Sequence, residues 1–232
     1  MDVSGSVALV TGANRGLGRV LASQLLERGA TTVYAAARDP QSITDERLVP
    51  VALDVTDPDS VRRAAQACGD VTLLINNAGR AGAGSLLTAD LGAVRGELDT
   101  NFLGPLLVTR AFAPVLARNG GGAVVNVLSV LSWLAAPLHG SYAATKAAAW
   151  SSTNSVRAEL RGQGTQVVGV HVGYMDTDMT AGLDVPKVPP AGVAAQILDA
   201  VAAGEDEVLA DDLTRGVKQL LSGPPAALAP SR

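Results

Sequence analysis

The sequence contains one cysteine, Cys68, and two histidines, His139 and His171, among its 232 residues. A single thiol cannot form an intrachain disulfide, and so few thiols cannot assemble a cysteine-rich metal site. We therefore expect catalysis without a metal ion. Basic residues are also scarce, because 18 lysines and arginines stand against 22 acidic residues, a net charge of -4. Binding to a nucleic-acid backbone needs a dense basic surface, so nucleic acid is not an expected partner.

Long apolar runs are missing as well. The longest, from residue 124 to 138, is interrupted by Asn126, Ser129 and Ser132, and it is shorter than the roughly 20 residues that a membrane span needs. The first residues show no basic region followed by an apolar segment and a cleavage site. We expect a cytoplasmic protein with no membrane partner.

Strand-like and helix-like patterns alternate along the whole chain. Aromatic residues are only 3%, whereas hydrophobic residues are 47% and glycines number 25, which indicates a core with closely approaching backbones. The alternation predicts an α/β fold, a single-domain doubly wound parallel sheet of the Rossmann type, with about seven strands and helices on both faces. We expect residues 1–223 to form this domain, with a short substrate lid near 180–190, and residues 224–232 to form a flexible tail. The expected strands lie at residues 7–10, 32–37, 49–53, 71–75, 121–128, 167–172 and 207–210.

The first strand runs into a glycine-rich turn, Thr11 to Gly18, that opens a helical pattern. Its glycines at 12, 16 and 18 follow G-x-x-x-G-x-G rather than the commoner G-x-G-x-x-G. Such a turn can present backbone N–H groups and a helix N-terminus to a pyrophosphate. A plain strand-to-helix connection that needs a positive φ is the alternative. The place directly after the first strand favours phosphate binding.

The second strand ends at Arg38, twenty residues past Gly18, where an adenosine ribose should be bound. An arginine can hold a 2′-phosphate through charge-assisted hydrogen bonds, and Arg15 could add a second cation. These two residues favour NADP(H). Asp39 could instead bind the ribose of NAD(H), which is the less favoured cofactor.

Two further strand ends carry candidate cofactor contacts. The third strand leads into Asp54 and Val55, a natural place for an adenine. The fourth is followed by Asn77-Ala78-Gly79, which leaves room for a flat ligand, although an ordinary Asn-Gly-type turn is the alternative.

Tyr142 and Lys146 lie four residues apart in an alanine-rich segment, so a helix would place them on one face. A cation about 4 Å from a phenol would lower its pKa by about one to three units. The pair therefore predicts a tuned proton donor. Ser129 ends the fifth strand, and Asn101 lies inside a long helical pattern, 90–118, whose Gly104-Pro105 predicts a kink. His139 has a suitable pKa for a general base, but the tyrosine and lysine account for the proton without it.

In their order and spacing these motifs resemble the short-chain dehydrogenase/reductase family, in its compact one-domain, carbonyl reductase-like form, over nearly the whole chain. The resemblance rests on residues 11–18, Asp54, residues 76–79, Asn101, Ser129, Tyr142, Lys146, Gly173 and Thr177. It implies that Ser129 holds the substrate oxygen, that Tyr142 protonates it, and that Lys146 binds the nicotinamide ribose and lowers the tyrosine pKa. It also implies that Asn101 orders a water behind Lys146.

The cofactor contacts expected from the motifs and the resemblance are Gly12, Asn14, Arg15, Gly16, Leu17, Gly18, Arg38, Asp54, Val55, Asn77, Ala78, Gly79, Tyr142, Lys146, Gly173 and Thr177. One departure is visible. Val172 precedes Gly173 where the family usually has proline, so the shape of that loop stays open. Candidates for the substrate pocket are Leu131, Trp133, Leu138 and Tyr174.

The expected reaction is hydride transfer between NADP(H) and a small-molecule carbonyl or secondary alcohol, with reduction of a ketone or aldehyde favoured. Imine or enone reduction on the same scaffold is one alternative. A non-catalytic NADP(H)-sensing regulator is another, although it would have no need of Ser129, Tyr142 and Lys146 together. The alanine-rich face after Lys146 suggests a homodimer or homotetramer.

Overall fold

The computed structural model describes residues 1–229 and contains one seven-stranded sheet in which all neighbouring strands are parallel. The strand order is β3-β2-β1-β4-β5-β6-β7, so the order reverses between β1 and β4, where open α/β sheets bind ligands. The predicted fold class is confirmed. The strands are β1 (Val7–Thr11), β2 (Thr32–Ala37), β3 (Val49–Ala52), β4 (Leu73–Asn76), β5 (Gly122–Val127), β6 (Thr165–His171) and β7 (Glu207–Leu209).

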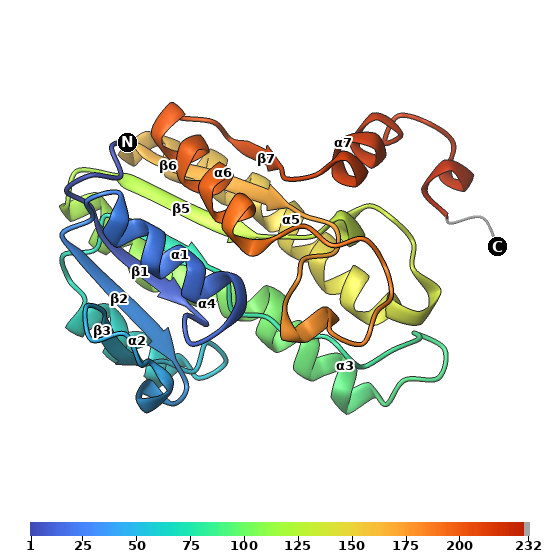
Figure 1. Ribbon diagram of the computed structural model, residues 1–232, viewed down its shortest axis with the longest axis horizontal. Coiled ribbons are helices and arrows are strands. Elements are labelled where there is room, and N and C mark those ends of the chain that lie inside the picture. Colours follow the sequence, from blue (N-terminus) through green and yellow to red (C-terminus); the bar gives the residue numbers. More distant parts are fainter. Residues whose placement is uncertain (230–232) are drawn as a thin grey trace.

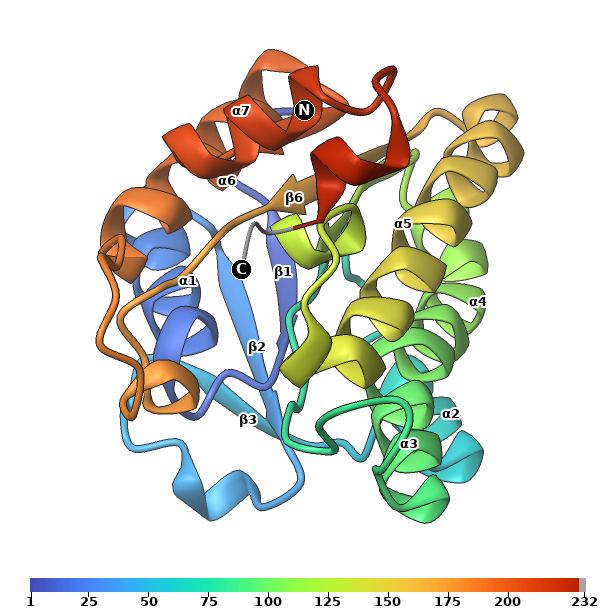
Figure 2. The same ribbon diagram turned by 90° about the vertical axis from the view of Figure 1, so that its right-hand side faces the viewer.

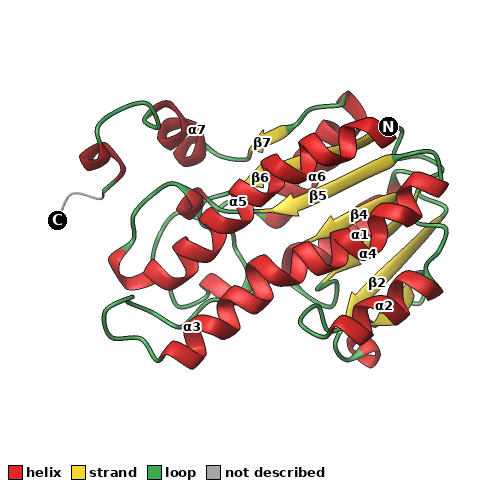
Figure 3. Ribbon diagram, turned by 180° about the vertical axis from the view of Figure 1, so that it is seen from behind, coloured by secondary structure: helices red, strands yellow, loops and turns green. Residues whose placement is uncertain are grey.

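Helices cover both faces of the sheet (Figures 1 and 3). On one face α1 (Gly16–Glu27) and α6 (Pro190–Ala203) bury their apolar sides against β1, β2 and β6. On the other face α2 (Pro58–Ala67), α4 (Gly104–Arg118) and the end of α5 (Gly140–Leu160) enclose a second core around Leu74 and Phe112. Two cores on opposite faces explain why β1, β4 and β5 are apolar in nearly every position.

The long helical pattern is interrupted where the sequence predicted a kink. The chain forms α3 (Leu91–Leu98), a π-turn at Asp99–Leu103 and then α4. Among the described residues, the run Leu91–Arg118 is long and apolar enough to cross a membrane by composition alone. Its Val108, Phe112 and Leu116 are fully buried within the domain, so this run is a helix of the domain core.

Two further segments, residues 180–190 and 207–229, follow the last long strand, β6. The segment 180–190, expected as a lid, is closed at its base by a parallel bridge between Met175 and Val188, and it includes the end of a 3₁₀ turn at Asp178–Thr180. Residues 207–229 carry β7, α7 (Asp212–Gln219) and a 3₁₀ turn, Pro225–Leu228.

The last of these turns lies in the segment that was expected to be a tail. A flexible tail was expected from residue 224 on, but the Leu228 carbonyl accepts a hydrogen bond from Ala135 N at 2.8 Å, and the Leu228 side chain packs beside Val130 and Trp133. Leu228 and these loop residues bury one another, so this part of the tail is held in place. Residues 230–232 of the expected tail lie outside the described residues.

Candidate active site

The glycine turn between β1 and α1 fits a phosphate group. Gly12 and Gly16 have φ values of +66° and +52°. A Cβ at Gly18 would lie 2.2 Å from the Gly12 carbonyl oxygen. Helix α1 begins with Arg15 as a cap that makes no side-chain hydrogen bond, and its first turn holds no acidic residue. Its first N–H groups therefore have no side-chain cap. The positive φ values confirm that the turn needs glycine, and phosphate binding stays a prediction.

The end of β4 ties this turn in place. Asn77 Nδ2 donates to the carbonyls of Thr11 at 2.9 Å and Gly12 at 3.2 Å, and the backbone N–H groups of Asn77 and Ala78 donate to Thr11 Oγ1. Asn77 thus acts on the turn by holding its backbone. Asn14 is half-buried, and Leu17 lies in the core beneath the turn.

The two arginines expected to bind the adenosine 2′-phosphate, Arg15 and Arg38, are exposed. Arg38 follows β2, and Arg15 lies 3.5 Å from the Asp178 carboxylate. The Asp39 carboxylate accepts a hydrogen bond from Gln41 N at 3.0 Å and caps a short turn, so it already has a structural partner. Asp54 accepts two hydrogen bonds from Thr56, which hold the pKa of its carboxyl below the usual range. Val55 is buried against Gly104.

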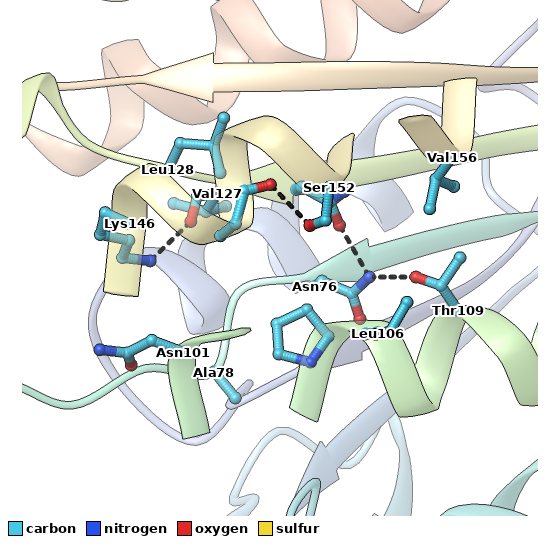
Figure 4. A pocket seen from close by; sticks show the side chains of 13 residues that line it. Asn76, Ala78, Asn101, Leu106, Thr109, Val127, Leu128, Lys146, Ser152 and Val156 are labelled. Carbon is cyan, nitrogen blue, oxygen red and sulfur yellow. Dashed lines mark hydrogen bonds between the residues drawn. The ribbon is translucent and has the colours of Figure 1, made fainter. Parts of the chain in front are cut away.

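Three candidate catalytic residues, Ser129, Tyr142 and Lys146, come from the end of β5 and from α5. Figure 2 shows α5 beside the sheet. Tyr142 and Lys146 lie one turn apart on α5, and the Lys146 Nζ is 5.6 Å from the centre of the Tyr142 ring. This ammonium is buried and donates to the Val127 carbonyl at 2.8 Å, as Figure 4 shows. Ser129 is buried just past β5, and its Oγ accepts from Leu131 N at 3.1 Å.

The pKa values of this pair differ from the sequence prediction. Burial raises the pKa of Tyr142 to about 12; the neighbouring Ser129 hydroxyl acts in the opposite direction, and the Glu97 carboxylate adds to the rise. Burial lowers the pKa of Lys146 to about 8. The prediction that Lys146 brings the pKa of Tyr142 toward neutrality is therefore wrong for this structure. The ammonium is directed at the Val127 carbonyl, and the loss of solvation outweighs its attraction for the phenolate.

Asn101, inside the π-turn, clamps the segment after Gly79 to the catalytic helix. Its side chain exchanges hydrogen bonds with the backbone N–H and carbonyl of Arg80, and it donates to Thr145 Oγ1 at 3.0 Å. Asn101 and Lys146 are among the residues that line a cavity of about 10 Å³ (Figure 4), which has room for about one water molecule. The water-binding role that the resemblance implies for Asn101 stays a prediction.

Glu97 belongs to the site although its sequence context does not single it out. Its carboxylate is buried, accepting a hydrogen bond from Ser141 Oγ at 2.5 Å and another from Ala83 N at 2.8 Å. It therefore joins α3 to the first turn of α5, one residue before Tyr142. A single acidic residue in an amphipathic helix looks solvent-exposed in the sequence, and only its partners 44 and 14 residues away reveal its role.

The loop after β6 is fixed by a residue that the sequence analysis did not single out. Gly173 N donates to Asp211 Oδ2 at 2.6 Å, and Asp211 also caps α7 through Thr214 N. This contact shapes the segment in which Val172 replaces proline. Thr177 lies beside the glycine turn, 3.5 Å from where a Cβ on Gly16 would be.

The four candidate residues of the substrate pocket differ in how far they are buried. Trp133 is buried, stacked on His171 at 3.7 Å and packed edge-on against Trp150, so it belongs to a side cluster of the core and not to an open pocket wall. Leu131 packs against the same cluster. Leu138 is 76% exposed on a short turn before α5, and Tyr174 is half-buried at the base of the lid.

Comparison with known proteins extends this description. The model of the protein family described as short chain dehydrogenase matches residues 6–186. The 2-(R)-hydroxypropyl-CoM dehydrogenase of Xanthobacter autotrophicus is 34% identical over 229 residues, which cover 86% of this chain and 92% of that protein. The 3-oxoacyl-[acyl-carrier-protein] reductase FabG of Vibrio harveyi is 32% identical over 193 residues, 79% of each chain. A solved short chain dehydrogenase from Burkholderia cenocepacia, in complex with NADP, is 42% identical, covers 98% of this chain and 97% of its own, and superimposes with a TM-score of 0.94.

Proposed function

This chain belongs to the short-chain dehydrogenase/reductase family, and we propose that it is an NADP(H)-dependent oxidoreductase acting on a carbonyl or secondary alcohol, with reduction of a ketone or aldehyde as the favoured direction. The observation that carries this proposal is the position of Tyr142, which has the Ser129 hydroxyl beside its own and Lys146 one helical turn away. These groups lie at the carboxyl edge of the sheet, where the glycine turn also ends.

The residues suit distinct steps of a reduction. The Ser129 hydroxyl donates a hydrogen bond to the substrate oxygen, which polarises the carbonyl. Because the pKa of Tyr142 is about 12, its phenol keeps its proton at neutral pH and serves as the general acid for that oxygen. Lys146, with a pKa of about 8, is mostly cationic at pH 7 and would bind the nicotinamide ribose. NADPH supplies the hydride when it is bound.

We propose NADP(H) rather than NAD(H) because the guanidinium groups of Arg38, which follows β2, and of Arg15, which lies near Asp178, are exposed, whereas the Asp39 carboxylate caps a turn. A guanidinium binds a phosphate through charge-assisted hydrogen bonds. The NADP complex of the Burkholderia protein supports this choice. The free N–H groups of α1 and the close approach at Gly18 would hold the pyrophosphate.

The test is NADPH oxidation, followed by absorbance, with panels of ketones, aldehydes, enones and cyclic imines. We expect turnover of a ketone or aldehyde, and a loss of kcat of about 1,000-fold in a Tyr142→Phe protein saturated with NADPH. Turnover of imines or enones alone would assign the alternative reductase activity. Tight NADPH binding without turnover of any substrate would assign a sensor.

We also propose that the protein is a homodimer or homotetramer. Leu103, the last residue of the π-turn, is 41% exposed, and Ala144 on α5 is exposed. Exposed apolar or small residues of this kind bury well against a second copy. Light scattering of the purified protein should give the mass of two or four chains.

A further inference from the structure

His171 is the last residue of β6, and its imidazole is fully buried. Its Nδ1 lies 3.2 Å from the carbonyl oxygen of Ser129. A carbonyl can only accept, so Nδ1 carries the proton and donates it. Burial lowers the pKa of His171 to about 4, so the ring is neutral at the pH of an assay and this tautomer is retained. Among the described residues, Nε2 has no hydrogen-bond partner.

Trp133 and Glu207 lie next to this ring. Trp133 stacks on it at 3.7 Å with an interplanar angle of 21°. Lys218 Nζ lies 5.0 Å from the centre of the Trp133 ring and donates to Glu207 Oε1 at 2.6 Å. The same carboxylate oxygen is 3.8 Å from His171 Nε2. Trp133 therefore packs on the face of the imidazole, and the Glu207 carboxylate lies near its Nε2 edge without a hydrogen bond.

The contact lies at the end of the pairing between β5 and β6. The pairing of β5 with β6 ends at Val127 and Val170, and the N–H groups of Leu128 and Val130 continue it to Val170 and Val172. Between these bonds the Ser129 carbonyl accepts from His171 Nδ1 and from Ser132 N at 2.9 Å. The imidazole thus adds a side-chain hydrogen bond to the backbone of the residue whose hydroxyl is proposed to hold the substrate.

We propose that His171 is a positioning residue for the reaction: its Nδ1–H fixes the Ser129 backbone and thereby aims the Ser129 hydroxyl at the substrate oxygen. This inference rests on the proposed role of Ser129. It gives no contact with substrate or cofactor to His171 itself. The other histidine, His139, lies half-buried on the turn before α5 and takes no part in this contact.

Two substitutions separate the hydrogen bond from the packing. In His171→Asn the amide nitrogen can stand where Nδ1 stands and donate to Ser129, whereas His171→Leu fills the space without a donor. We expect the leucine variant to lose about tenfold in kcat, the size of one hydrogen bond, with the affinity for NADPH unchanged. The asparagine variant should keep most of the activity. His171→Gln, whose amide reaches toward the Nε2 position, should lose activity as leucine does, and it replaces the leucine variant if that one fails to fold.

The decisive measurement combines the donor-free substitution of His171 with Ser129→Ala. The kcat and KM of the double variant and of Ser129→Ala are measured with the fastest ketone or aldehyde of the panel. If His171 acts through the serine hydroxyl, adding His171→Leu, or His171→Gln in its place, to Ser129→Ala should change kcat by less than about twofold. Three outcomes would overturn the inference. The first is a loss of kcat on removal of the His171 donor that is equally large in the wild-type and Ser129→Ala backgrounds. The others are a wild-type kcat in both His171→Leu and His171→Gln, or a folded His171→Asn protein whose kcat is as low as that of His171→Gln. Full activity of Ser129→Ala alone would instead overturn the proposed function.

Discussion

The two halves of the carboxyl edge of the sheet hold their functional groups in different ways. In the cofactor half, at the ends of β1, β2 and β3, the backbone is packed tightly around Gly18, but the side chains of Arg15 and Arg38 are exposed. In the catalytic half, at the ends of β5 and β6, the side chains of Ser129, Lys146 and His171 are buried and bonded to backbone carbonyls or N–H groups.

This difference follows from what each half must do. A cofactor that enters and leaves is held by a rigid backbone cradle together with flexible cations. Proton transfer needs groups whose positions and pKa values are set in advance, and burial does both at a cost in stability. The largest effects on cofactor binding should therefore come from the backbone of the first half, and the clearest pH effects from the second.

The strongest test of the rigid cradle is Gly18→Ala. Its Cβ would lie 2.2 Å from Gly12 O and 2.5 Å from Asn77 Nδ2, so the turn must shift. We expect the free energy of unfolding to fall by about 3 kcal/mol and NADPH binding to weaken about 100-fold, measured by urea denaturation and fluorescence titration. Gly162→Ala is the matched control, since nothing lies within 4 Å of its Cβ. Equal behaviour of the two variants would show that the cradle adapts.

Arg38→Ala tests the flexible cation of the same half. Removing a charge-assisted hydrogen bond to the 2′-phosphate should weaken NADPH binding about 30-fold, because such a bond contributes about 2 kcal/mol. NADH binding should stay nearly unchanged, since NADH lacks that phosphate. Arg118→Ala, an exposed arginine at the end of α4, is the control. If both cofactors are weakened equally, Arg38 does not distinguish them.

In the catalytic half, His171 should make the protein sensitive to acid. Its pKa is about 4 in the fold against about 6.5 when unfolded, so the unfolded chain binds the additional proton. Stability is complete above pH 6.5 and is lost as the pH falls toward 4. Between pH 7.5 and 5 we expect His171 to account for a loss of about 2 kcal/mol. The difference between wild type and His171→Asn in urea titrations at both pH values isolates this contribution, and parallel curves would argue against it.

Among these predictions, removal of the Lys146 charge should have the smallest effect, a change in the free energy of unfolding. Its pKa is about 8 in the fold and about 10.4 when unfolded, so the buried cation destabilises the cofactor-free protein below pH 8. Lys146→Met should then raise the free energy of unfolding at pH 7 by about 1 kcal/mol, net of the lost hydrogen bond to Val127. The gain should shrink as the pH rises toward 10. Lys187→Met, on the lid, should give no such pH-dependent gain; a destabilised Lys146→Met protein would contradict the prediction.

Much of the site was predictable because its signals are local. Strand runs, the glycine spacing and the four-residue separation of Tyr142 and Lys146 each depend on neighbours in the sequence, and the fold and family that they indicated are confirmed. The roles of the individual residues remain proposals. The sequence misled on the tyrosine pKa because it predicted a contact from spacing alone, whereas Lys146 is directed at a carbonyl 19 residues away.

What the sequence by itself determined is the architecture, together with the candidates for the reacting groups, because hydrophobic periodicity and turn residues act over a few positions. What only the tertiary structure decided is how those groups are held and charged. Glu97 reaches Ser141 across 44 residues, and His171 reaches Ser129 across 42. Desolvation, which sets the pKa values of Tyr142, Lys146 and His171, depends on everything packed around a group, and no local pattern of residues records it.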